Sequence, residues 1–346
     1  AQACTLLRLG LACSTDFQFD VARSAYERAF DLWEAALESE PPESAPELPV
    51  TLRYGVCEPV SLDPGRAGDD LTAFVIGQLM EGLVELDEAW GIVPSLASRW
   101  TVSSDGCSYT FHLRPGWRWS DGRALTAHDF EYAWKRNLAL AAESPAALLL
   151  YVLRGAQAYA EGNGPAEAVG VQALDDRTLE ARLDRPAGYF PQLLTHPVTF
   201  PLPRWVVEGD RQPWTAPGTI VCNGAWLLEA WEPGKRMAFT RNPRYRGLSR
   251  GNAARIEAPV VEDHQALLPA FEAGDLDGIS LLRTRPMQVA GLRARYRRQL
   301  TMTPYLSTFY LSFNCGRPPF DNLAARQAFV QAIDRVGLLA RVDMRQ

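Results

Sequence analysis

The chain has 346 residues, 47% of them hydrophobic and 22% charged, which is typical of a globular protein large enough for more than one core. Its 41 acidic residues outnumber the 35 basic ones, so the formal net charge is −6 and no surplus of cations can neutralise a phosphate backbone. We therefore expect no nucleic-acid partner for this chain. No apolar run approaches the ~20 residues that are needed to cross a bilayer.

The first 38 residues have helical periodicity and few helix breakers, which predicts a helical hairpin over residues 1–38. Two interpretations of this hairpin fit equally well: a tetratricopeptide-like repeat, or an ordinary amphipathic pair of helices. A lone repeat cannot bury its faces, because about three are needed for stability. The positions that match the repeat are Leu6, Leu9, Gly10, Cys13, Ala22, Tyr26 and Ala29.

The cysteines and the start of the chain suggest no special chemistry. The six cysteines include no CxxC pair, and no histidine is spaced to complete a zinc site, so we expect mostly free, buried thiols and neither metal nor cofactor. Residues 9–13 loosely resemble a lipoprotein cleavage site at Cys13, but Arg8 interrupts the short apolar stretch and disfavours that interpretation.

Residues 39–49 are rich in proline and glutamate, which favour neither helix nor sheet, and they predict a linker. After it, alternating patterns predict strands over residues 50–56, 108–114 and 177–183. A capping box at Thr126 and Asp129 predicts the start of a helix, and a second long helix is expected over residues 324–339. Because the elements do not alternate regularly as βαβα, we expect a mixed α/β fold rather than a barrel.

Residues 103–136 carry the most specific pattern in the chain. They combine an alternating strand, the Trp117 and Trp119 pair, a turn at residues 120–122 and the capped helix. This segment resembles the signature of family 5 solute-binding proteins of the oligopeptide-binding type. Further landmarks of that family follow in the expected order at residues 58–64, 80–84, 196–197, 221–226, 241–245, 271–277 and 303–314.

The resemblance implies a periplasmic-binding-protein-like fold with two lobes that close on a ligand. It places the first lobe at residues 50–80 and 204–306, and an additional subdomain at residues 81–203. The second lobe would begin near residue 307 and be incomplete, because the family continues well beyond residue 346. We therefore expect the 346-residue chain to bind peptides weakly or not at all, and residues 307–346 to be mobile.

The resemblance also implies a ligand-binding set, which consists of Gly68, Asp69, Asp70, Asn223, Tyr305 and Tyr310. The loop at residues 68–70 matches one whose backbone pairs with an extended peptide, although a merely solvated loop fits its two aspartates equally well. The two tyrosines match cleft residues, but they stand five apart in a strand-like segment, so at least one is expected in the core. For Asn223 a structural turn at the mouth of the cleft is favoured. A cleft tyrosine of the family corresponds here to Ala146.

The family likeness implies an extracytoplasmic receptor that captures short peptides for the permease subunits of an ABC importer. The alternative is a ligand-sensing module in a cytoplasmic transcriptional regulator with tetratricopeptide repeats. We expect no enzyme, because the four histidines fall in separate segments and no GxSxG, HExxH or GxxxxGK motif is present.

Overall fold

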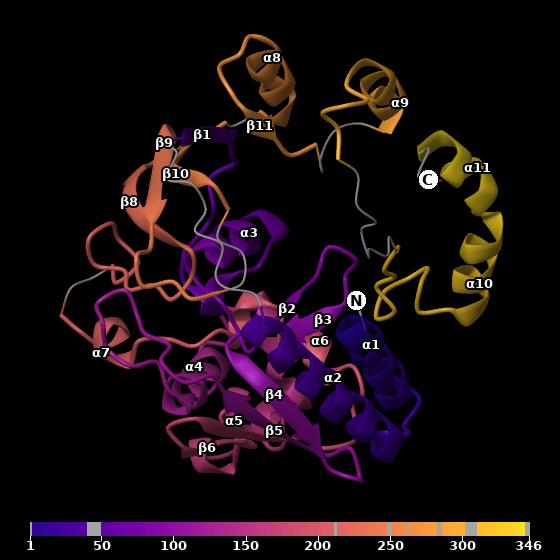
Figure 1. Ribbon diagram of the computed structural model, residues 1–346. Coiled ribbons are helices and arrows are strands. Elements are labelled where there is room, and N and C mark those ends of the chain that lie inside the picture. The colour runs from indigo at the N-terminus through magenta and orange to yellow at the C-terminus, as the bar shows by residue number, and fades with distance from the viewer. Residues whose placement is uncertain are drawn as a thin grey trace. The chain divides into compact units, whose positions relative to one another are not determined.

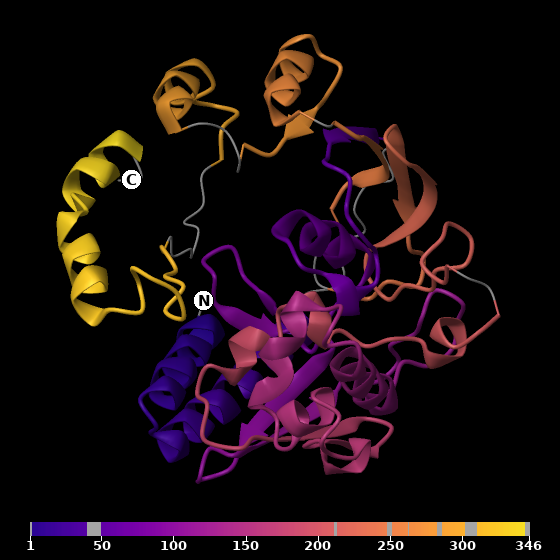
Figure 2. The same cartoon turned by 180° about the vertical axis from the view of Figure 1, so that it is seen from behind.

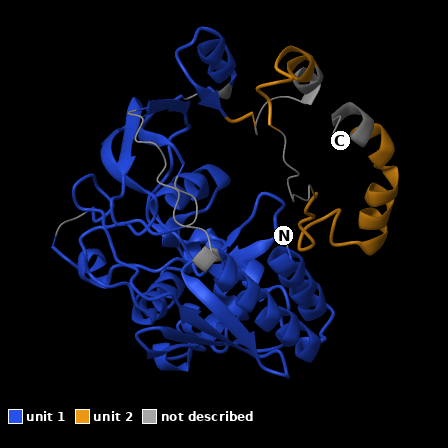
Figure 3. Cartoon of the chain, in the orientation of Figure 1, with its two compact units in different colours: residues 1–279 blue, residues 280–346 orange. Residues whose placement is uncertain are grey.

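The protein, described here by a computed structural model, is defined over residues 2–39, 50–210, 213–247, 251–261, 263–281, 286–301 and 310–342. The chain forms two compact units, residues 1–279 and residues 280–346 (Figure 3). Most of the predicted linker, residues 40–49, lies outside the described residues. In the part of the chain that is described, no helix has the length and apolarity that a membrane span requires.

A helical hairpin opens the first unit, as the periodicity predicted (Figures 1 and 2). Its helices are α1 (Gln2–Thr15) and α2 (Phe19–Ser39). A Cβ atom at Gly10 would lie 2.6 Å from the ring of Tyr26, so the close approach of the two helices depends on glycine at this position. Whether the hairpin derives from a tetratricopeptide repeat stays a prediction.

The hairpin buries its apolar face against a β-sheet of the same unit. The Trp100 ring on β4 (Ala97–Val102) meets Phe30 with 4.6 Å between ring centroids and Tyr26 with 5.3 Å, both edge to face. Arg8 adds an ion pair with Asp87 at 3.0 Å. A single hairpin therefore finds in the sheet the apolar partner that further repeats would otherwise supply.

That sheet is antiparallel, with strand order β4-β5-β7-β6. Its other strands are β5 (Ser108–Leu113), β6 (Val171–Asp175) and β7 (Thr178–Arg182), and β5 and β7 confirm two of the predicted strands. Side chains alternate across it: Trp100, Phe111 and Leu179 are paired in register and buried, whereas the neighbouring row faces outward.

The predicted capped helix is α4 (Ala127–Ala139), and both halves of its capping box are present. The Asp129 carboxylate accepts hydrogen bonds from the Thr126 backbone at 2.8 Å and from the Trp119 indole at 3.2 Å. Farther along α4, the side chains of Phe130 and Trp134 are fully buried. The capping box thus connects the Trp119 turn to the start of the helix.

A second, five-stranded sheet has the order β11-β1-β10-β9-β8. Its strands are β1 (Val50–Gly55), β8 (Trp226–Glu232), β9 (Arg236–Arg241), β10 (Ala253–Pro259) and β11 (Gly278–Ile279). Strand β1 runs parallel to β10 and β11, whereas β8, β9 and β10 are antiparallel. Arg53 and Asp277 fasten β1 to the turn before β11, with 2.7 Å between Nη2 and Oδ1.

The remaining elements of the first unit are short. They are η1 (Pro64–Arg66), α3 (Asp70–Leu79), β2 (Val84–Leu86), β3 (Ile92–Pro94), η2 (Pro145–Val152), α5 (Ala156–Ala160), η3 (Ala166–Ala168), α6 (Phe190–Leu193), η4 (Pro197–Thr199), α7 (Arg204–Val207), η5 (His264–Ala266) and α8 (Leu267–Glu272). All six cysteines are free, but only Cys222 is buried, so the expectation of mostly buried thiols is wrong.

The second unit contains α9 (Pro286–Arg295), α10 (Leu323–Ala332) and α11 (Arg335–Val342). The single helix predicted over residues 324–339 is wrong, because Ile333 is extended and the Asp334 carboxylate accepts a hydrogen bond from Gly337 N at 2.9 Å. The predicted start of the second lobe, near residue 307, falls among residues outside the described ranges.

Candidate functional site

The predicted peptide-contacting loop leads directly into α3. Asp69 is the N-cap of that helix, and its carboxylate accepts hydrogen bonds from Leu71 N at 3.0 Å, Thr72 N at 2.9 Å and Thr72 Oγ1 at 2.7 Å. The side chain of Asp69 therefore stabilises the helix start. Gly68 and Asp70 on either side of it are exposed, so the loop presents backbone and one carboxylate to solvent.

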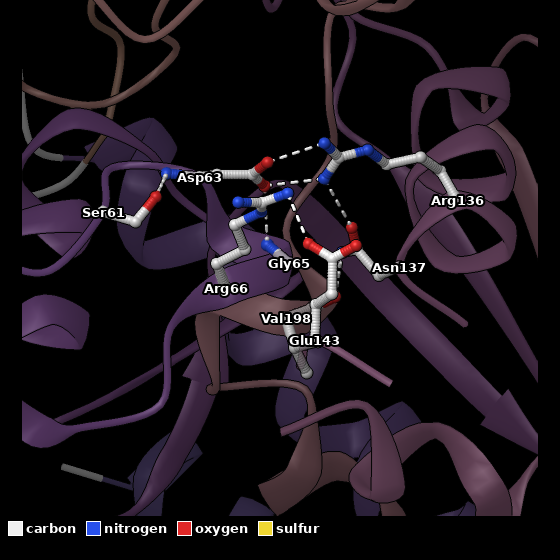
Figure 4. Close-up of polar contacts among 8 residues, drawn as sticks. All are labelled: Ser61, Asp63, Gly65, Arg66, Arg136, Asn137, Glu143 and Val198. Atoms are coloured by element: carbon white, nitrogen blue, oxygen red, sulfur yellow. Dashed lines mark hydrogen bonds and ion pairs between the residues drawn. The ribbon is translucent and has the colours of Figure 1, made fainter. Parts of the chain in front are cut away.

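A buried ion pair holds the segment that precedes this loop (Figure 4). Arg136 on α4 binds Asp63 in a bidentate manner, with Nη1 to Oδ1 and Nη2 to Oδ2 both at 2.6 Å. Asp63 Oδ1 also accepts from Gly65 N at 2.9 Å, which forms the turn at η1. A fork-to-fork pair of this kind fixes both distance and orientation.

Gly65 is required where the segment crosses α4. A Cβ atom there would lie 2.4 Å from Asn137 Oδ1 and 2.8 Å from Arg136 Nη1. Asn137 in turn donates to the Val198 carbonyl at 2.8 Å (Figure 4). The loop is thereby attached to α4 and, through it, to η4.

The second ion pair in this view, between Arg66 and Glu143, lies on the surface. The atoms Nη2 and Oε2 are 2.6 Å apart, but about half of each side chain is exposed. An exposed pair contributes about 0–1 kcal/mol, so Asp63 and Arg136 rather than Arg66 and Glu143 position the loop.

His196 lies beneath the start of α3. Its Nδ1 accepts a hydrogen bond from Val198 N at 3.1 Å, so the ring proton is carried by Nε2 when the imidazole is neutral. Burial lowers the pKa of His196, and the negative charge of Asp70 acts in the opposite direction. Asp70 thus has a neutral imidazole in its neighbourhood at neutral pH.

Asn223 is buried and forms a structural cross-link rather than part of an exposed surface. Its Oδ1 accepts from Glu81 N at 3.2 Å, and its Nδ2 donates to the Glu81 carbonyl at 3.1 Å. A Cβ atom at Gly224 would lie 2.6 Å from the Leu79 backbone, so the turn packs directly against the end of α3. With 1% of its surface exposed, Asn223 supports the turn interpretation and offers no surface to a ligand in this structure.

Neither predicted tyrosine belongs to the described part of the first unit. Tyr310 belongs to the second unit, where it is 81% exposed and outside regular secondary structure, and Tyr305 lies outside the described residues. Ala146, the position of a cleft tyrosine in the family, is buried on η2 next to Pro145, which Gly68 approaches. The described part of the candidate site is therefore the anchored loop at residues 68–70.

Sequence reasoning missed the two supporting residues Arg136 and Asn137. Arg136 is the last residue of the recognised signature and Asn137 follows it, but their partners, Asp63 and the Val198 carbonyl, are 73 and 61 residues away, and no local pattern pairs them. Among the described residues, no group of three or more histidine, cysteine or acidic side chains is placed to hold a metal ion. An exposed backbone with one carboxylate can bind a polar solute.

Comparison with known proteins identifies the family. The model of bacterial extracellular solute-binding proteins, family 5, matches residues 91–343, which is most of the chain. The chain belongs to this family. The expected mixed α/β, periplasmic-binding-protein-like fold is confirmed by solved structures. The Escherichia coli murein tripeptide binding protein MppA superposes with a TM-score of 0.73 at 30% identity over 84% of this chain and 57% of that one.

Two further relatives likewise match most of this chain but little more than half of their own length. The probable deoxycholate-binding periplasmic protein YgiS of Escherichia coli is 31% identical over 88% of this family 5 chain and 58% of its own length. Haemophilus influenzae OppA, solved in complex with the peptide RPPGFSPFR, has a TM-score of 0.74 at 31% identity over 84% of this chain and 57% of that one. The chain thus spans little more than half the length of these relatives.

Proposed function

We propose that this family 5 protein belongs to a receptor that captures short peptides outside the cytoplasm and delivers them to the permease subunits of an ABC importer. The observation that carries the proposal is the loop at residues 68–70, in which Gly68 and Asp70 are exposed and which follows the segment anchored by the buried Asp63–Arg136 pair. An exposed stretch of backbone can form hydrogen bonds with an extended peptide irrespective of the peptide's side chains.

The relatives support this proposal because several of them are named as peptide-binding proteins. They include the periplasmic oligopeptide-binding protein OppA of Escherichia coli, at 32% identity over 84% of this chain, and the MppA and OppA structures described above. Their periplasmic location supports a location outside the cytoplasm. None of these relatives supports the regulator alternative, which we do not propose.

We also propose the domain assignment that the family implies, with a first lobe at residues 50–80 and 204–306, a subdomain at residues 81–203, and a second lobe from residue 307. The two sheets support the first part of this division. All strands of the five-stranded sheet come from residues 50–55 and 226–279, whereas those of the four-stranded sheet come from residues 97–182.

Amide chemical shifts test the proposal, because they detect even weak binding. We would titrate the ¹⁵N-labelled chain with a mixture of tripeptides and expect the Gly68 and Asp70 amides to respond. Asp70→Asn should weaken the response several-fold, about 1 kcal/mol for one partly exposed charge, whereas the exposed Glu88→Gln should not. A response to deoxycholate alone, or to peptides only at sites away from residues 66–71, would contradict peptide capture by this loop.

A further inference from the structure

A cavity whose lining includes none of residues 63–70 lies where the N-terminal hairpin meets the four-stranded sheet. Its volume is about 400 Å³. Arg99 on β4, His112 on β5 and Thr178 on β7 stand side by side in the strand register and form one outward-facing row of the sheet. Arg177, Asp175 and Glu34 of α2 complete its charged lining.

The two arginines of this cavity act on their neighbours only through their charge, Arg99 on His112 and Arg177 on Asp175. In the described residues, neither the Arg99 nor the Arg177 guanidinium has a hydrogen bond or an ion pair, and both residues are exposed. Other arginines of the chain are held in ion pairs, such as Arg136 with Asp63 and Arg255 with Glu229, whereas the guanidiniums of Arg99 and Arg177 remain available to a ligand.

Of the two acidic residues that line the cavity, Asp175 is engaged in hydrogen bonds, whereas Glu34 acts only through its charge. The Asp175 carboxylate accepts hydrogen bonds from Arg177 N at 2.7 Å and from Thr178, which lowers its pKa and closes the turn between β6 and β7. Glu34 acts electrostatically on Arg114, which is partly buried beyond the end of β5. Among the described residues, three charged side chains that line the cavity therefore have no hydrogen bond: the donors Arg99 and Arg177 and the single acceptor Glu34.

His112 stands between these guanidiniums and lacks an anionic neighbour strong enough to keep it charged. Burial and the positive charge of Arg99 lower its pKa, against a smaller opposite effect of Asp175. An anion in the cavity would reverse this balance, because it would favour the imidazolium form. The imidazole is therefore a built-in reporter of anion binding.

We propose that this cavity binds a small oxyanion group, phosphate or carboxylate, through the guanidinium groups of Arg99 and Arg177 with His112 as a third donor. Planar guanidiniums present paired N–H groups that match the oxygens of either group. Because Glu34 comes from α2 and the other residues come from the sheet, the bound group lies at the junction of the hairpin and the sheet.

The test follows the four histidine resonances of the whole chain during pH titrations with and without inorganic phosphate, and in a second arm with acetate. We expect the anion that binds to raise the pKa of His112 while those of His128 and His196 remain unchanged. The arm that responds distinguishes a phosphate site from a carboxylate site. Arg99→Gln combined with Arg177→Gln should weaken binding by about tenfold or more, since each lost charge-assisted hydrogen bond costs at least that order.

The exposed, unpaired residues Arg154 and Arg185 provide the matched control. Arg154→Gln with Arg185→Gln removes the same charge outside the cavity and should leave the His112 shift intact. Arg99→Lys with Arg177→Lys keeps the charge but not the paired donors, and should give intermediate affinity. No response of His112 to either anion, or the same loss in the control pair, would overturn the proposal. Peptide binding at residues 68–70 is measured separately, so failure of the anion proposal would leave the proposed peptide-binding function untouched.

Discussion

Arg136 reaches across from α4 and holds both carboxylate oxygens of Asp63, a residue 73 positions earlier in the chain. Only 7% of the Asp63 side chain and 19% of the Arg136 side chain are exposed, so this is a largely buried ion pair. It is the contact that fixes the segment before the exposed loop at residues 68–70 to the body of the first unit.

Removal of one partner of this pair should be costly. Arg136→Gln leaves a buried carboxylate without its cation, and we expect the free energy of unfolding to fall by about 3–5 kcal/mol. Urea denaturation measures the change. Arg66→Gln, which breaks the exposed pair with Glu143, should change it by less than about 1 kcal/mol. Equal effects of the two variants would show that the buried pair does not anchor the loop.

The stability of the first unit should depend on pH through Glu85 on β2. Burial and the neighbouring charge of Glu81 raise the pKa of Glu85 to about 7 from its usual 4.5, against the opposing charge of Arg114. Between pH 4.5 and 7 the folded state therefore binds a proton that the unfolded state lacks, and stability is lost as the pH rises through this window.

We expect Glu85→Gln to remove much of the decrease in the free energy of unfolding between pH 4.5 and 7. At pH 8 the variant should be more stable than the parent chain by up to about 3 kcal/mol. Urea denaturation midpoints of the parent chain and the variant at pH 5 and pH 8 measure both effects. Glu81, whose carboxylate accepts from Ser95 and Tyr245, also has a raised pKa and contributes with the same sign, so a residual slope is expected. The exposed Glu143→Gln serves as control; a slope unchanged by Glu85→Gln would refute the assignment.

The N-terminal hairpin should unfold together with the sheet that it covers. Phe30→Ala removes a buried ring that packs on Trp100, and we expect a loss of about 3–5 kcal/mol in the free energy of unfolding of the whole first unit. Leu32→Ala, at a 40% exposed position of the same helix, should cost about 0.5 kcal/mol or less.

Two probes distinguish a joint transition from separate ones. In a background in which Trp33 of α2 is replaced by phenylalanine, tryptophan fluorescence reports on tryptophans outside the hairpin, Trp100 among them, and far-ultraviolet circular dichroism reports largely on the helices. If Phe30→Ala melted the hairpin at a lower urea concentration and left the transition of the sheet in place, the hairpin would be an independent module.

Asn223 should affect stability and not ligand affinity. Asn223→Ala leaves the buried N–H and C=O of Glu81 without partners, and we expect a cost of about 1–3 kcal/mol. At a temperature where the variant remains folded, its peptide response at residues 68–70 should match that of the parent chain. A selective loss of peptide response without loss of stability would instead indicate that Asn223 contacts the ligand.

The sequence alone identified features whose cause is local. Alternation of apolar side chains located β5 and β7, and the capping box located the start of α4, because each pattern needs only neighbours along the chain. The one helix expected near the C-terminus failed for the opposite reason. Its periodicity continues across residue 333, but the Asp334 side chain competes for the backbone of the next turn and divides the helix.

Reasoning from the sequence identified only part of the candidate site. The family landmarks led to the loop at residues 68–70, yet they could not show that Asp69 is used as a helix cap or that Asn223 is buried against Glu81. Both outcomes depend on which segments meet in space. Tyr305 lies outside the described residues, and Tyr310 belongs to the second unit.

The order of strands, turns and caps, and with it the family, was therefore determined by the sequence itself. Only the tertiary structure decided that Arg136 binds Asp63, that Trp100 receives Phe30, and that Arg99 and Arg177 stand unpaired beside His112. The physical reason is that periodicity and capping act between residues a few positions apart. Ion pairing, burial and charge balance instead depend on partners that the chain brings together from distant positions.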